Sequence, residues 1–168
     1  MKQIITYDFR TDKSQIIEPK RIAVRAVIKN GNKLFLVHLK KTNEYKFPGG
    51  GVEKDETLEA ALTRETLEES GAKLTKIIKC FGYIDQIYPD KYKAGETFFL
   101  RSIYYLCEIK ENYSDLNLSK SEKELGFSPS WVDVETAIST NQSCLDSGSK
   151  YHWTERELYM YNYIKKYL

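Results

Sequence analysis

Seven acidic side chains lie close together in one short stretch of the chain, and their types and spacing suit the binding of a cation. Residues 53–69 hold seven Asp or Glu against two basic residues, a net charge of −5, whereas the whole chain carries +2. On a helix, Glu65, Glu68 and Glu69 fall within an arc of roughly 100°. Clustered carboxylates suit Mg²⁺ or Mn²⁺, which also bridge to phosphate oxygens. The stretch therefore indicates metal-assisted attack on a phosphoanhydride.

The same arc of the helix also carries apolar residues. Leu58, Ala61 and Leu62 fall on the side of Glu65, so the carboxylates continue an apolar stripe and point inward or toward a cleft. Most glutamate-rich helices are solvated surfaces. A carboxylate removed from water without a partner is costly, however. The shared arc therefore favours a site over a solvated surface.

A helix and two pairs of strands are expected to position these carboxylates. The helix spans residues 55–70, after the glycine-rich segment 47–51 and before Gly71. Asn30-Gly31 suits a two-residue hairpin turn between the first two strands. Four β-rich segments are expected to form the sheet: residues 21–28, 33–41, 74–88 and 97–109.

The rest of the chain is expected to alternate loops with short elements. Residues 110–129 are polar and predict a long surface loop. Three further segments follow: a short strand at 131–134, a short helix at 135–140 and a loop at 141–150. Thr154 and Glu157 have the spacing of a capping box that opens a closing helix. The order of elements predicts an α+β fold in a single domain over residues 1–168, with 1–20 as an N-terminal extension and 151–168 as a C-terminal helix.

Composition excludes several classes of protein. With 168 residues and 41% hydrophobic content, the chain can bury one core. Lys and Arg total 26 against 24 Asp and Glu, so no strong positive field favours nucleic acid as a partner. The longest apolar run, Ile103–Cys107, is too short for a membrane span, which predicts a cytoplasmic protein with no membrane partner. Cys80, Cys107 and Cys144 lack the spacing of a disulfide framework or zinc site.

The acidic stretch resembles the Nudix box of the Nudix hydrolases, in particular the MutT-like members. Seven fixed positions of that motif are present: Gly50, Glu56, Arg64, Glu65, Glu68, Glu69 and Gly71. Thr66 and Ala72 depart from the residues usual in the family, and both are packing positions. The entry segment 47–50 and a Trp-containing segment downstream extend the resemblance over roughly residues 20–135.

The resemblance implies a Nudix fold, a mixed β-sheet sandwiched between α-helices, and it implies roles for the motif. Glu65, Glu68 and Glu69 would bind Mg²⁺ or Mn²⁺, with the Gly49 carbonyl as a further ligand. Glu56 and Arg64 would hold the loop–helix–loop in shape. The general base varies within the family. It would be a box glutamate or a carboxylate of the later loop: Glu124, Glu122 or, less favoured, Glu111.

The resemblance also implies hydrolysis of a nucleoside diphosphate linked to another moiety, and so a small nucleotide as partner. The favoured substrate is a nucleoside triphosphate, oxidised forms included; nucleotide sugars, ADP-ribose and dinucleoside polyphosphates stay open, as does a homodimer. The rivals are a non-catalytic nucleotide sensor and an isomerase acting on a non-nucleotide diphosphate. Arg25 could hold a phosphate or make a surface salt bridge, and Phe47 could stack on a base or serve in packing.

Overall fold

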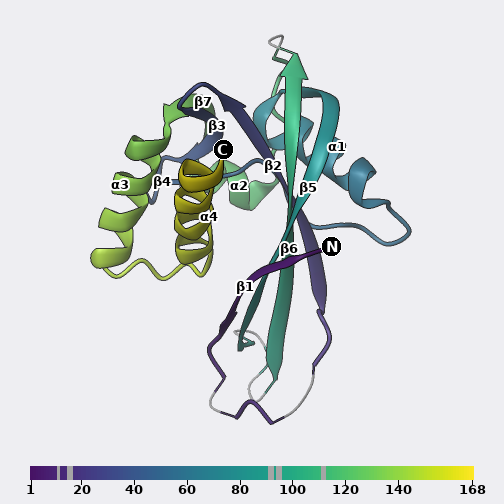
Figure 1. Ribbon diagram of the computed structural model, residues 1–168, viewed down its shortest axis with the longest axis vertical. Helices are drawn as coiled ribbons and strands as arrows, with labels where there is room; N and C mark the ends of the chain where they lie inside the picture. Colours follow the sequence, from purple (N-terminus) through teal and green to yellow (C-terminus); the bar gives the residue numbers. More distant parts are fainter. Residues whose placement is uncertain (11, 15–16, 91–92, 94–95, 111–112) are drawn as a thin grey trace.

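The computed structural model describes residues 1–10, 12–14, 17–90, 93, 96–110 and 113–168 (Figure 1). Its elements in chain order are β1 (Gln3–Asp8), β2 (Arg21–Asn30), β3 (Lys33–Leu39), β4 (Glu44–Lys46), α1 (Leu58–Ser70), β5 (Lys73–Pro89), β6 (Thr97–Lys110), α2 (Lys120–Leu125), β7 (Phe127–Asp133), α3 (Val134–Asp146) and α4 (Trp153–Tyr167). None of the helices in this described part is long and apolar enough to cross a membrane.

The strands form a mixed sheet in the order β1-β5-β6-β2-β3-β4, with β7 also paired to β3. β2 runs parallel to β6 along Arg21–Ile28 but pairs with β3 only at the hairpin tip. The sheet therefore divides into two halves that diverge from this tip. Because Asn30 pairs with Lys33, the loop residues are Gly31 and Asn32, one position later than the expected Asn-Gly pair.

Helices cover the sheet from two sides, which confirms the predicted α+β fold. α1 packs on β2 and β5, whereas α3 and α4 pack on each other and on β4; Figure 1 shows α1 to the right of the long strands and α3 and α4 to the left. Along β2, Val27 belongs to the core shared with α4, and Val24 and Ala26 belong to the core shared with α1. β2 is apolar on both faces because both faces are covered.

The box helix α1 begins later than the sequence pattern predicts. It starts at Leu58 rather than at Asp55, whose φ of +63° is incompatible with a right-handed helix. Thr57 is the N-cap, and its hydroxyl accepts a hydrogen bond of 3.1 Å from the Ala60 N–H. The helix ends at the left-handed Gly71, as predicted.

The segment predicted to be a long loop is partly ordered. It contains α2, which is capped by Ser119 and Glu122, and β7 begins at Phe127 rather than at residue 131. α3 spans Val134–Asp146, so it replaces both the short helix predicted at 135–140 and the first half of the loop predicted at 141–150. With only six residues, α2 is too short to show a helical hydrophobic periodicity in the sequence.

The capping box predicted for the closing helix is wrong. The N-cap of α4 is His152, which makes no side-chain cap bond. The Thr154 hydroxyl instead donates to Glu44 Oε1 at 2.6 Å, and Glu157 accepts the Phe47 N–H at 3.1 Å. Both residues are buried, so tertiary partners about 110 positions away override the local pattern.

The polar N-terminal segment adds a strand that the sequence pattern does not predict. β1 pairs in parallel with β5, and the Tyr83 N–H donates to the Lys2 carbonyl at 3.0 Å. Gly82 permits this approach: its φ is +136°, and a Cβ there would lie 2.1 Å from the Lys2 oxygen. The first residues of the expected extension therefore belong to the sheet.

Candidate active site

Arg64 connects the box helix to the loop before it. Its Nε and Nη2 donate to the two oxygens of Glu56, each at 2.9 Å, and Nη2 also donates to the Gly51 carbonyl at 3.1 Å. These hydrogen bonds from Arg64 lower the pKa of Glu56 to about 2. Glu56 is therefore charged at neutral pH, and the pair fastens the loop to α1 through a bidentate contact.

The third donor of Arg64 holds two of the predicted metal ligands together. Its Nη1 lies 2.8 Å from Glu65 Oε1 and 3.2 Å from Glu68 Oε2. Glu65 also packs against the glycine loop, since a Cβ on Gly50 would lie 2.2 Å from its Oε2. The Glu68 side chain is 31% exposed against 14% for Glu65, so Glu68 is the more accessible of the two.

Glu69 lies deeper than its two neighbours, with a side chain 3% exposed. Lys46 Nζ is 2.7 Å from Oε1, and the Gly49 N–H donates to Oε2 at 2.9 Å. Burial raises the pKa of Glu69, and the charges of Lys46 and Arg25 oppose that rise. The sequence analysis missed Lys46. The one signal that could have found it is the position of a basic residue shortly before the glycine loop.

Arg25 is buried beside the glycine loop, which rules out the surface salt bridge. Its Nη1 donates to the Gly49 carbonyl, the oxygen predicted to be a further metal ligand. Burial lowers the pKa of Arg25. The guanidinium is directed at the backbone in this structure. A contact between Arg25 and a phosphate therefore stays a prediction.

Phe47 is not available to a substrate, so the predicted base contact is wrong. The side chain is fully buried in the core beneath α4, and its ring centroid lies 5.8 Å from that of Tyr104 and 5.1 Å from that of Tyr161. Three aromatic rings in contact fill the space that a stacked base would need. Phe47 therefore positions the segment that leads into the glycine loop.

The two loop acids proposed as bases differ in their surroundings, and Glu111 lies outside the described residues. Glu122 completes the cap of α2, where its Oε2 accepts the Ser119 N–H at 2.7 Å. Glu124 is exposed and has no hydrogen bond or ion pair among the described residues. Glu122 therefore serves in the cap of its own helix, and a role of Glu124 as the base stays a prediction.

Segment 113–117 brings this region against the box helix. The Asn117 N–H donates to the Glu68 carbonyl at 2.9 Å, and its side-chain amide lies 3.4 Å from Glu68 Oε1. Nothing in the sequence distinguishes this asparagine from other polar loop residues. Through it, the segment that leads into α2 contacts a predicted metal ligand directly.

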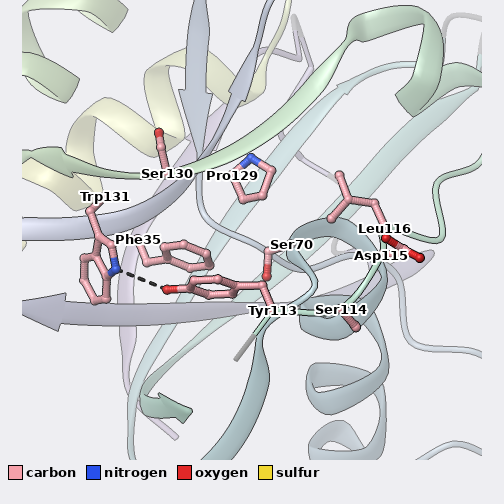
Figure 2. Close-up of a pocket in the computed structure, with 9 residues that line it drawn as sticks. All are labelled: Phe35, Ser70, Tyr113, Ser114, Asp115, Leu116, Pro129, Ser130 and Trp131. Carbon is pink, nitrogen blue, oxygen red and sulfur yellow. Dashed lines mark hydrogen bonds between the residues drawn. The ribbon is translucent and has the colours of Figure 1, made fainter. Parts of the chain in front are cut away.

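A cavity of about 380 Å³ lies beside the C-terminal end of α1, next to Ser70 (Figure 2). The Phe35 and Tyr113 rings stack at 5.3 Å, and Trp131 Nε1 donates to the Tyr113 hydroxyl at 3.3 Å. Pro129 and Leu116 line the cavity above these rings in Figure 2. Trp131, in the segment singled out from the sequence, is thus part of an aromatic wall near the box.

The carboxylates have the donor chemistry for a divalent metal, although basic side chains hold them in this structure. Among the described residues, no three His, Cys, Asp or Glu side chains are arranged to hold a metal ion. The predicted ligands are instead paired with Arg64, with Lys46 and, at the Gly49 carbonyl, with Arg25. Hard oxygen donors on adjacent turns fit Mg²⁺ or Mn²⁺ in kind, and a bound cation would replace these contacts.

Two curated relatives carry names that describe nucleotide hydrolysis. The chain is 49% identical to an 8-oxo-dGTP diphosphatase of Buchnera aphidicola over 61 residues, 36% of this chain and 48% of that protein. It is 28% identical to the nucleoside triphosphatase NudI of an Enterobacter species over 116 residues, 68% of this chain and 77% of that protein. The chain therefore spans about half the length of the first relative and three quarters of the second.

Solved structures share the fold at low sequence identity. A NUDIX hydrolase from Nitrosomonas europaea aligns with a TM-score of 0.61 at 17% identity, covering 86% of this chain and 89% of that one. A MutT NUDIX hydrolase from Burkholderia pseudomallei aligns with a TM-score of 0.55 at 20% identity, covering 71% and 86%. The NUDIX domain family matches residues 19–153, and with the box geometry above this means that the chain belongs to the NUDIX family.

Proposed function

We propose that this protein hydrolyses a phosphoanhydride bond in a nucleoside diphosphate linked to another moiety, with Mg²⁺ or Mn²⁺ as cofactor. One observation carries the proposal: Arg64 holds Glu65 and Glu68 with a single guanidinium nitrogen while its other donors fasten the loop through Glu56. A protein that only bound nucleotides would have no need to keep several carboxylates together at such electrostatic cost. The arrangement therefore favours a metal-dependent enzyme over a sensor.

A nucleoside triphosphate, oxidised forms included, is the substrate we favour. The names of the two relatives, an 8-oxo-dGTP diphosphatase and a nucleoside triphosphatase, support this choice. Nucleotide sugars, ADP-ribose and dinucleoside polyphosphates present the same diphosphate to the box, so they belong in the same screen. Recognition of the group attached to the diphosphate depends on surface loops outside the box.

Each side chain of the site has a proposed role. Glu65, Glu68 and Glu69 would hold the cation, which when bound neutralises phosphate charge and lowers the pKa of water. Arg64 fixes the position of these carboxylates and of the glycine loop. Glu124, exposed and unpaired among the described residues, would accept the proton of the attacking water.

The decisive experiment compares Glu68→Gln with the parent protein on a panel of nucleotides, with and without Mg²⁺. We expect the parent to release phosphate or pyrophosphate only with the metal, and Glu68→Gln to lose about 10²-fold or more of that rate. Stability without metal should stay level or rise, because a repulsion between like charges is removed. Glu59→Gln makes the same change at an exposed position of α1 and serves as control.

Two outcomes would contradict the proposal. Full Mg²⁺-dependent turnover by a well-folded Glu68→Gln variant would remove the box from catalysis. Tight nucleotide binding by the parent without any hydrolysis, across the whole panel and with either metal, would favour the sensor instead.

A further inference from the structure

Lys46 is a cation at the site that the box motif does not account for. It ends the short strand β4, three residues before Gly49, and its Nζ lies 2.7 Å from Glu69 Oε1. The two side chains are 13% and 3% exposed, so water screens this pair little. The box supplies its own arginine for Glu65 and Glu68, but Glu69 takes its counter-ion from outside the helix.

Lys46 and a bound metal would compete for the Glu69 carboxylate. The Gly49 N–H engages Oε2 and the Lys46 ammonium engages Oε1, so both oxygens of Glu69 already have a partner. A divalent ion on Oε1 would place a double positive charge within a few ångströms of Nζ, in a site that water screens poorly. The two cations therefore compete for Glu69.

The Lys46 side chain has the flexibility to move away from Glu69. Its ammonium is a point charge on a flexible four-carbon stem, unlike the planar fork of an arginine. Nζ also lies 4.5 Å from the centre of the Phe127 ring, whose face offers a cation–π contact that does not depend on Glu69. On release, the ammonium would remain near the box, where it would be able to neutralise the charge of a bound phosphate oxygen.

We propose that Lys46 is an exchangeable counter-ion: it neutralises Glu69 in the metal-free protein, gives way to the metal, and then contacts the phosphates of the nucleotide. The proposal rests on the metal-dependent function proposed above. It predicts that one substitution of Lys46 strengthens metal binding and weakens nucleotide binding. Loss of a purely structural lysine would not change these two affinities in opposite directions.

The test is Lys46→Met, measured by calorimetry with Mn²⁺ alone and then with a non-hydrolysable nucleoside triphosphate at saturating Mn²⁺. We expect Mn²⁺ to bind about tenfold more tightly, because its competitor is gone, and the nucleotide to bind several-fold more weakly. Lys54→Met removes the same charge from an exposed position of the acidic stretch and should change neither affinity appreciably. Lys46→Arg retains the charge and should not tighten Mn²⁺ binding.

Thermal unfolding without metal provides a second measurement. Lys46→Met leaves the buried Glu69 without its counter-ion, so it should melt at a lower temperature than the parent and gain more from added Mn²⁺. If this variant does not fold, Lys46→Gln, which keeps a hydrogen-bond donor without the charge, takes its place in every measurement.

The outcomes separate this proposal from the function on which it rests. If the parent hydrolyses nucleotides with Mn²⁺ and Lys46→Met binds Mn²⁺ as the parent does, Lys46 does not compete with the metal and the inference fails alone. If Mn²⁺ binding tightens but nucleotide affinity is unchanged, the contact with phosphate is wrong. If the parent binds no metal and hydrolyses nothing, the proposed function itself fails.

Discussion

Two buried glutamates hold the segment before the glycine loop from opposite sides, and they are held in different ways. Glu69 of α1 accepts the Gly49 N–H and pairs with Lys46, whereas Glu157 of α4 accepts the Phe47 N–H and pairs with Arg156. Both side chains are at most 3% exposed. Burial alone therefore does not distinguish a structural carboxylate from a proposed metal ligand.

The cations make the difference. Arg156 reaches Glu157 with Nε at 3.0 Å and Nη2 at 2.6 Å, while its Nη1 donates to Gln86 and Ser102. A planar fork with its donors satisfied stays in place. Lys46 offers Glu69 a single donor on a flexible stem. We infer that α4 carries a permanent ion pair and α1 a replaceable one.

The largest effect should come from breaking the permanent pair. Glu157→Gln leaves Arg156 buried without its counter-charge, which should cost about 3–5 kcal/mol of unfolding free energy and lower Tm by roughly 10 °C. Thermal unfolding with and without Mn²⁺ measures this change. Mn²⁺ should raise the Tm of Glu157→Gln by no more than it raises the Tm of the parent, whereas it should raise the Tm of Lys46→Met by more.

Glu155→Gln, on the first turn of the same helix, is the matched control and should change Tm little. Recovery of the Glu157→Gln protein by Mn²⁺ would show that the two glutamates belong to one site and would abolish the distinction between them.

The surface helix α2 shows a similar contrast between two carboxylates: Glu122 belongs to the cap of the helix, whereas Glu124 has no partner among the described residues. Glu124→Gln should lower the turnover number by about 10²-fold, the scale of a lost general base, while nucleotide affinity stays nearly constant. Glu122→Gln should leave turnover intact, because glutamine also serves in a capping box. Steady-state kinetics of both variants across pH measures the difference.

Parent rates and an unchanged pH profile in both variants, and in the double variant, would place the base among Glu65, Glu68 and Glu69. The free carboxylate of α2 would then be ordinary surface.

Arg64 combines both kinds of contact, because it binds Glu56 of the loop and also Glu65 and Glu68, the proposed metal ligands. Arg64→Ala should lower stability by about 1–2 kcal/mol through the lost contact with Glu56, and it should weaken Mn²⁺ binding through the disordered Glu65 and Glu68. Chemical denaturation and calorimetry measure the two effects. A change in the Michaelis constant alone, with metal affinity intact, would mean that Arg64 contacts substrate instead.

The box and its helix could be predicted from the sequence because their contacts are local. The acidic stretch and the stop at Gly71 lie within about 20 positions, and the contact between Glu56 and Arg64, which the family resemblance implies, spans eight. The strands on which the helix packs, β2 and β5, were predicted as well, since both segments are rich in β-forming residues.

The failures concern partners that are distant in the sequence. Thr154 and Glu157 match a local capping pattern, but they bind residues of the β4 region instead. Phe47 looks like a ring available for stacking until Tyr104 and Tyr161 are placed around it. Lys46 becomes part of the site only when β4 lies beside α1. Side-chain type alone cannot reveal such neighbours.

The parallel pairing of β1 with β5 bears on the order in which the chain folds. Gln3 lies opposite Tyr83, so this contact closes a loop of nearly eighty residues, and the Lys2 carbonyl can dock only once the backbone around Gly82 has formed. Closing a long loop costs chain entropy, and few contacts offset that cost until the partner strand is in place. We therefore expect β1 to join the sheet only after β5 and β6 have paired.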